Sequence, residues 1–274
     1  MLRSTFHHLE GISLATEAGL WRSGIRDWSE LAGHLDLIGP PGSLRRERIA
    51  RGLAESEAAL AGRRGDFFAR RLAGGEHWRL YPAFRSATAF LDIETTSLSP
   101  FEGIVTVVTV HGGGATRSFV ADDNLEELPA YLQRFQLLCT FNGRLFDVPF
   151  LQFRFPQWTP PEGHLDLRFA LYRVGQAGGL KRIEERLRLG SRTGVEGLHG
   201  LDAVRLWEQY RRGSSSALER LIQYNRADAV NLEPLAEWTV RELTRRSVGN
   251  AVAPPRPDRS PPSGAPVPGR ASGG

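Results

Sequence analysis

The 274-residue sequence contains little cysteine, almost no lysine and no long apolar run. Its single cysteine, Cys139, excludes an internal disulfide framework and a zinc site built from cysteines, and it favours a reducing compartment. No apolar stretch approaches the ~20 residues that a membrane-spanning helix needs. The first residues also lack the apolar core of a signal peptide. We therefore expect a soluble, cytoplasmic protein without a membrane partner.

The charge of the chain is mildly positive. Lys181 is the only lysine, so arginine carries nearly all of the basic charge, and the formal net charge is +4. This balance suits a polyanionic partner, although a coding bias explains the preference for arginine equally well. The hydrophobic content of 41% is enough for one full domain and a smaller unit.

Composition and periodicity divide the chain into three parts. Residues 1–83 show helical spacing of apolar residues, with Asp27 and Ser43 as expected helix caps. Residues 84–248 alternate between strand and helix patterns. Residues 249–274 are rich in proline, glycine and serine, and we expect a disordered tail because they cannot bury enough apolar surface to offset the entropy of ordering.

The middle part predicts an α/β fold. Strands are expected at 87–94, in a hairpin over 104–120, at 137–141 and in a short extended segment at 164–167, and the remainder is helical. Three strands in a meander, followed by alternating helices and strands, indicate a mixed sheet flanked by helices on both faces.

Two carboxylates stand at the tip of the first strand. Asp92 and Glu94 lie two residues apart, so both project from one face of the strand. Like charges at this spacing repel each other, and a hard divalent cation such as Mg²⁺ or Mn²⁺ relieves the repulsion. Taken alone, the pattern favours two solvated acids before a turn.

Asp147 lies within an apolar sequence that follows the strand at 137–141. An unpaired buried carboxylate is costly. Pro149 is comfortable only in the first turn of a helix, so Asp147 is expected near the start of that helix, where the helix dipole favours negative charge. A role as a helix-start acid and a role as a metal ligand both remain open for this residue.

Tyr224 and Asp228 are four residues apart and share one face of a long helix. Leu221 and Leu232 lie on the same face, which therefore points inward. A hydrogen bond between the tyrosine and the aspartate is a sufficient structural explanation. Taken with Asp92, Glu94 and Asp147, however, four acids fall on three apolar elements of one unit. Without metal such a cluster would be destabilising, and with two divalent cations it could hydrolyse phosphodiesters.

The blocks FLDIETT, FNGRLFDVPFL and YNRADAVNL resemble the three motifs of the DEDD exonucleases, which have the ribonuclease-H-like fold. The third block matches the tyrosine form of that motif (DEDDy). Three segments between the second block and the third resemble the bacterial YprB-like ribonuclease-H-like proteins: HLDLRFALYR, GGLKRIEERLRLGSRTG and LWEQYRRGSSSALERLIQYN. The resemblance extends over about residues 84–245. It implies a ribonuclease-H-like fold and 3′–5′ exonuclease activity with two Mg²⁺ or Mn²⁺ ions.

The resemblance also implies a role for each acid. Asp92 would bind both ions, Glu94 and Asp228 would complete the site of the ion that carries the attacking water, and Asp147 would hold the second ion. Tyr224 would orient the water.

Further candidate residues have two possible roles. Asn142 could contact substrate or fix a turn. Lys181 and Arg192 could bind a nucleic-acid backbone or lie on an exposed helix face. Asp166 could support the metal site, but capping of the following helix is favoured.

The main hypothesis is thus a metal-dependent 3′–5′ exonuclease that acts on single-stranded DNA or RNA. The alternative is a non-catalytic nucleic-acid-binding module of the same fold in a repair or processing complex. The N-terminal sequence HLEGISLATEAGLWRSGI faintly resembles a helix-hairpin-helix. Its usual second glycine is Ser13, so a purely structural pair of helices is favoured.

Overall fold

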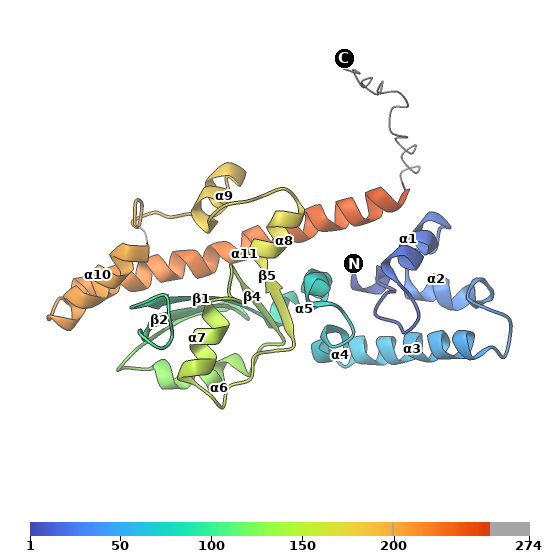
Figure 1. Ribbon diagram of the computed structural model, residues 1–274, viewed down its shortest axis with the longest axis horizontal. Helices are drawn as coiled ribbons and strands as arrows, with labels where there is room; N and C mark the ends of the chain where they lie inside the picture. Colours follow the sequence, from blue (N-terminus) through green and yellow to red (C-terminus); the bar gives the residue numbers. More distant parts are fainter. Residues whose placement is uncertain (199, 253–274) are drawn as a thin grey trace, which may run out of the picture.

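A computed structural model describes residues 1–198 and 200–252. A group of N-terminal helices lies beside an α/β body, and one long helix crosses the body (Figure 1). Among the described residues, no helix combines the length and the apolar character that a membrane span requires.

The N-terminal region is helical, as predicted. Asp27 and Ser43 cap their helices through side-chain oxygens that accept backbone amides, which confirms both expected caps. The stretch before the sheet also forms short helices. The elements are η1 (Leu2–Ser4), α1 (Leu14–Arg22), α2 (Trp28–Gly33), η2 (Leu35–Leu37), α3 (Leu44–Ala61), α4 (Gly65–Ala69), η3 (Gly74–Arg79), α5 (Tyr81–Phe84) and η4 (Arg85–Ala87).

The N-terminal helices end in ordinary caps. At the start of α1, the Ser13 side chain accepts the Thr16 amide, so the residue that replaces the expected glycine satisfies the helix itself. This arrangement fits the structural pair of helices that the sequence favours.

The sheet is mixed and has five strands in the order β3-β2-β1-β4-β5. β1 pairs antiparallel with β2 and parallel with β4. The β2–β3 hairpin turns at Gly113 and Gly114, both with positive φ, as the glycine run predicts. The strands are β1 (Thr88–Thr95), β2 (Val105–Gly112), β3 (Ala115–Val120), β4 (Leu137–Thr140) and β5 (Gly163–Asp166).

Helices cover both faces of the sheet, which confirms the predicted fold class. α11 crosses one face, while α6 and α7 lie on the other (Figure 1). The remaining elements are η5 (Leu125–Glu127), α6 (Leu128–Leu132), α7 (Asp147–Arg154), α8 (Leu167–Arg173), α9 (Leu180–Leu187), α10 (Gly200–Arg211) and α11 (Ser215–Val252). Because α11 ends at Val252, most of the tail expected over 249–274 lies outside the described residues.

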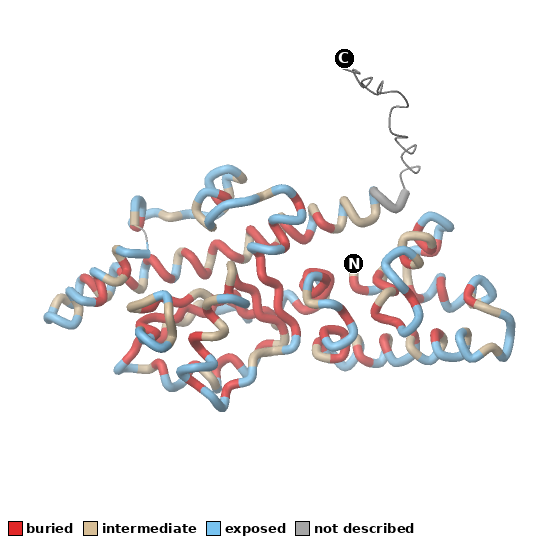
Figure 2. The backbone as a smooth tube through the Cα atoms, viewed as in Figure 1, coloured by how far each residue is buried: buried red, intermediate tan, exposed pale blue. Residues whose placement is uncertain are grey.

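Buried residues lie in the sheet, along α11 and in the N-terminal helices (Figure 2), and they form two hydrophobic clusters. Alternate residues of β1 enter different clusters: Phe90 packs on the side of the N-terminal helices, and Leu91 packs on the side of α6 and α7. Trp28 and Phe68 from the N-terminal region belong to the same cluster as Phe90. The N-terminal helices therefore share a core with the sheet.

Candidate metal centre and its cavity

Three carboxylates meet where β1 ends beneath α11. Oxygen atoms of Asp92, Glu94 and Asp228 all lie within 4.8 Å of one another. The alternation of β1 places Asp92 and Glu94 on the face that Phe90 shares, and α11 supplies Asp228 from the adjacent layer. The sequence prediction that these residues converge is confirmed for this group.

Asn225 is a member of this site that the sequence analysis missed. Its side chain is fully buried, and its Nδ2 donates a hydrogen bond of 2.8 Å to Asp92 Oδ2. Helical spacing alone placed the neighbouring Tyr224 and Asp228 on the inward face and gave no reason to add Asn225. The available signal was an asparagine in a largely apolar helix segment, where it is unfavourable without a buried partner.

The carboxylates are electrostatically crowded. Burial raises the pKa of Asp92 well above its ordinary value, and the charges of Asp228, Glu94 and Asp147 raise it further. Burial and Asp228 likewise raise the pKa of Glu94. Among residues 1–198 and 200–252, no arginine or lysine forms an ion pair with Asp92 or Glu94. A cluster of hard oxygen donors that lacks enough positive charge fits a divalent cation such as Mg²⁺ or Mn²⁺.

Asp147 lies at the first residue of α7, as the position of Pro149 predicts, and is only 4% exposed. It is not a member of the three-residue carboxylate group, but its charge raises the pKa of Asp92 and Glu94. Burial raises the pKa of Asp147 itself to about 7, with a further contribution from Asp166. Backbone hydrogen bonds from Asp147 and Ile93 oppose the rise.

Asp166 orders the loop that leads to α7. Its carboxylate caps α8 by accepting the Arg168 amide, which confirms the favoured capping role. It also accepts the amides of Asn142 at 2.8 Å and Arg144 at 3.0 Å. One carboxylate thereby joins the end of β4 to the start of α8.

Asn142 fixes the turn after β4. Its φ of 70° is left-handed, a conformation that asparagine tolerates better than most residues. Its Oδ1 accepts a hydrogen bond of 2.7 Å from Arg168 Nη1. Of the two roles expected for Asn142, these contacts supply the structural one.

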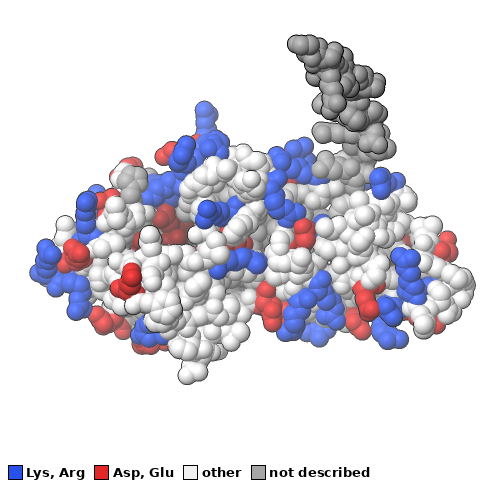
Figure 3. Space-filling view, in the orientation of Figure 1, with Lys and Arg blue, Asp and Glu red and all other residues white. Residues whose placement is uncertain are grey.

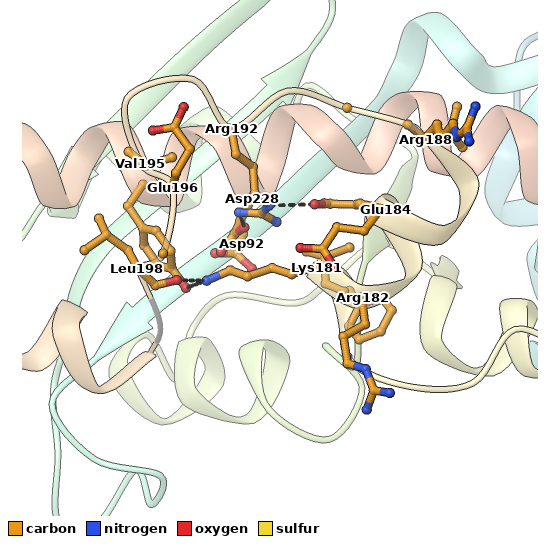
Figure 4. A pocket seen from close by; sticks show the side chains of 18 residues that line it. Asp92, Lys181, Arg182, Glu184, Arg188, Arg192, Val195, Glu196, Leu198 and Asp228 are labelled. Carbon is orange, nitrogen blue, oxygen red and sulfur yellow. Dashed lines mark hydrogen bonds and ion pairs between the residues drawn. The ribbon is translucent and has the colours of Figure 1, made fainter.

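Lys181 does not lie on a solvated helix face. Its Nζ donates a 2.7 Å hydrogen bond to the Tyr224 hydroxyl and a second one to the Leu198 carbonyl (Figure 4). Burial lowers the pKa of Lys181, while the charges of Asp228 and Glu94 oppose this effect. Burial raises the pKa of Asp228, and Arg192, Lys181 and Tyr224 oppose this rise.

Arg192 lies in the segment after α9, not on a helix. Its guanidinium contacts Asp228 Oδ1 at 2.5 Å and Glu184 Oε2 at 2.6 Å (Figure 4). Glu184 is buried, although its sequence setting among charged residues gave no sign of this. The pairing joins two segments that are far apart in the chain.

These residues line a cavity of about 910 Å³ between β1, α9 and α11. Arg182 and Arg188 lie on its wall beside Lys181 and Arg192. Figure 3 shows Lys and Arg side chains gathered on the side of the molecule where α9 lies. The lining mixes four cations with acids that include Asp92, Asp228 and the exposed Glu185 and Glu196. The acids suit metal ions, and the cations suit a phosphate-bearing ligand.

A family model described as the RNase H superfamily matches residues 89–240, more than half of the chain. The protein therefore belongs to the RNase H superfamily. No curated protein matches it.

Solved structures with a similar chain trace include NrnC of Brucella melitensis with bound Mg²⁺, at 20% identity and a TM-score of 0.40 over 61% of this chain and 81% of NrnC. The same protein bound to pGG gives 20% identity and a TM-score of 0.41 over 62% and 79%. The family B DNA polymerase of the hyperthermophilic archaeon Pyrobaculum calidifontis gives 17% identity and a TM-score of 0.49, over 61% of this chain and 27% of the polymerase. The matched region thus spans about a quarter of the polymerase.

Proposed function

We propose that this protein is a metal-dependent 3′–5′ exonuclease of the DEDDy type, similar to the YprB-like proteins, that hydrolyses the ends of single-stranded nucleic acid. The observation that carries the proposal is the group formed by Asp92, Glu94 and Asp228, whose carboxylate oxygens lie within 4.8 Å of one another beside a cavity with cationic walls. Membership of the RNase H superfamily supports the same conclusion.

The four acids have distinct positions and therefore distinct proposed roles. Asp92, whose pKa the charges of the other three acids raise, would be the ligand common to two divalent ions. Glu94 and Asp228 would complete one ion site. Asp147, outside the group of three, would hold the second ion. Bound divalent ions supply positive charge that favours activation of water and stabilises the leaving oxygen.

Hydrogen bonds from neighbouring side chains hold the carboxylates in place. Asn225 donates to Asp92, so one carboxylate oxygen is held in a fixed direction. The Tyr224 hydroxyl accepts a hydrogen bond from Lys181, and Tyr224 opposes the raised pKa of Asp228 one turn along the same helix. Because Lys181 Nζ donates to the tyrosine oxygen, the phenolic proton is free to point toward Asp228 or toward a water molecule. We assign Tyr224 the positioning of the attacking water.

Cations on the cavity wall suit the substrate backbone. Lys181 and Arg192 face the carboxylates, and the exposed Arg182 and Arg188 lie farther out on the same wall. A phosphodiester that approaches the acids would meet these charges first. Phosphate contacts of this kind supply affinity without reading sequence.

The test is incubation of the purified protein with single-stranded DNA and RNA carrying a 5′ label, in Mn²⁺, Mg²⁺ or EDTA. We expect a ladder of products that shorten stepwise from the 3′ end with either metal, and intact substrate in EDTA. Asp92→Asn should abolish the ladder. Asp123→Asn, at an exposed acid far from β1 in the sequence, is the matched control and should leave it unchanged.

The result separates the two hypotheses. Tight binding of the single strand without cleavage in either metal would support the non-catalytic module. Release of short products from a 5′ end would keep a nuclease but contradict the proposed direction.

A further inference from the structure

A second cavity adjoins the carboxylate cavity. It has a volume of about 770 Å³, and Phe141 and Gly179 line both cavities. The two spaces therefore meet at the end of β4 and the start of α9. The remaining lining residues come from the loop between β4 and α7, from α8 and from the loop after α8: Asn142, Leu145, Arg168, Phe169, Tyr172, Gln176, Ala177 and Gly178.

The wall of this second cavity exposes aromatic side chains. Phe169 is 45% exposed and Tyr172 is 73% exposed. They lie three residues apart in α8 and thus on neighbouring positions of one face, while Leu167 and Leu171 bury the other face in the core. Large apolar groups gathered at an open cavity mark a binding surface more often than scattered exposed residues do.

The same wall is held firmly. Arg168 donates to Asn142 Oδ1, and Asp166 accepts the amides of both residues. The hydrogen bond to Asn142 therefore holds the guanidinium in the lining of the cavity that the two aromatic residues also line. A surface that is ordered before binding loses less entropy when it takes up a ligand.

We propose that this cavity is a stacking subsite for an unpaired base, adjacent to the nucleotide whose phosphodiester lies at the carboxylates. The inference rests on the proposed function and adds residues that would select the substrate. Phe169 and Tyr172 offer π faces to the base, and Arg168 offers a planar cation and hydrogen-bond donors.

The chemistry favours a nucleobase over other apolar ligands. The cavity adjoins one whose lining carries Lys181, Arg182 and Arg188, so a ligand with an aromatic ring at one end and a phosphate at the other suits both. A base in a duplex is paired at its edge and stacked on its neighbours, so it cannot enter. The subsite therefore selects single strands.

The experiment measures binding in EDTA, where no cleavage occurs, by anisotropy of a 5′-fluorescein single-stranded oligonucleotide. The double substitution Phe169→Ala with Tyr172→Ala removes both rings. Loss of base stacking should weaken binding by about 5- to 150-fold. Leu44→Ala, which truncates another exposed apolar residue in the N-terminal region, should change it less than twofold.

Abasic nucleotides placed in turn at the first four positions from the 3′ end locate the subsite. At one position, loss of the base should weaken binding to the wild type by about 5- to 150-fold. Binding to the double variant should not change. Such coupling identifies a direct contact, and a general loss of fold would not produce it.

The outcomes are separable from those for the nuclease. If the double substitution and an abasic position show this coupling, but the protein cleaves nothing in Mn²⁺ or Mg²⁺, the subsite is kept and the proposed function is overturned. If the wild type cleaves, but an abasic nucleotide weakens its binding no more than that of the double variant at every position, the subsite is overturned. Failure of the wild type to bind the oligonucleotide at micromolar concentration would also overturn it.

Discussion

The guanidinium of Arg192 lies 2.5 Å from Asp228, so an arginine neutralises one of the three clustered carboxylates. Both side chains are largely withdrawn from solvent, with 17% and 9% exposure. A cation that uses Asp228 as a ligand must therefore compete with Arg192 for the same charge. Glu184 accepts a hydrogen bond from Arg192 and offers it an alternative partner.

We expect Arg192→Gln to strengthen binding of Mn²⁺ by about tenfold, a change of ~1.4 kcal/mol, because the competing charge is removed. In EDTA the same substitution should lower the unfolding temperature, since Asp228 loses its partner. Calorimetric titration and thermal unfolding measure the two effects. Arg182→Gln, on the same cavity wall, is the control and should change neither the Mn²⁺ affinity nor the unfolding temperature. Weaker Mn²⁺ binding by Arg192→Gln would show that Arg192 supports the metal site.

Asp228→Asn and Tyr224→Phe should differ in effect although they share a helix face. Asp228→Asn removes a charged ligand, so cleavage should be almost lost. The Mn²⁺ concentration that gives half of the maximal rate (the metal midpoint) should rise. The second removes one hydroxyl, so the metal midpoint should hold while turnover falls by about 10²-fold. Cleavage rates across a range of Mn²⁺ concentrations distinguish these results. Equal metal midpoints for both variants would mean that the two roles are wrongly assigned.

Metal-free stability should fall as pH rises from about 4 to about 7. Burial raises the pKa of Asp147 to about 7, so the folded protein retains a proton that the unfolded chain has already lost in this range. Denaturation midpoints in EDTA at pH 5 and pH 8 test this, and Asp147→Asn should reduce the difference between them. Mg²⁺ should raise stability mainly at pH 8, because it binds the ionised carboxylates. A wild type more stable at pH 8 than at pH 5 in EDTA would contradict the assignment.

Removal of residues 1–83 should prevent stable folding, because Trp28 and Phe68 share a core cluster with Phe90 of the sheet. A single substitution measures this dependence without deleting the region. Phe68→Ala, at a fully buried ring, should cost about 3–5 kcal/mol in the free energy of unfolding. Leu44→Ala, on the surface of α3, should stay within about 0.5 kcal/mol. A chain lacking residues 1–83 that unfolds cooperatively at the wild-type temperature would refute the shared core.

Much of the fold could be predicted because its signals are local. The two-residue spacing of a strand predicts that Asp92 and Glu94 share one face of β1, and the glycine run predicts the hairpin. Ser43 and Asp27 mark helix starts. The strand order and the packing of the N-terminal helices could not be read in this way, because they depend on which apolar faces meet after folding.

The site shows the same division. Spacing within a helix reveals Tyr224 and Asp228, since both belong to one element. The partnership of Arg192 with Asp228 and Glu184 joins three segments, and no local pattern encodes it. Lys181 carried a weak signal as the sole lysine, but its bond to Tyr224 is again a tertiary contact.

α11 runs without a break from Ser215 to Val252 and carries Tyr224, Asn225 and Asp228 as well as core residues such as Leu235. A substitution in such a helix perturbs one position, but an inserted residue rotates everything beyond it by about 100°. An insertion between Asp228 and Leu235 would thus turn the face that carries Asp228 away from the core face. Natural variation in chain length should therefore fall in the loops on either side of this helix and leave the helix itself uninterrupted.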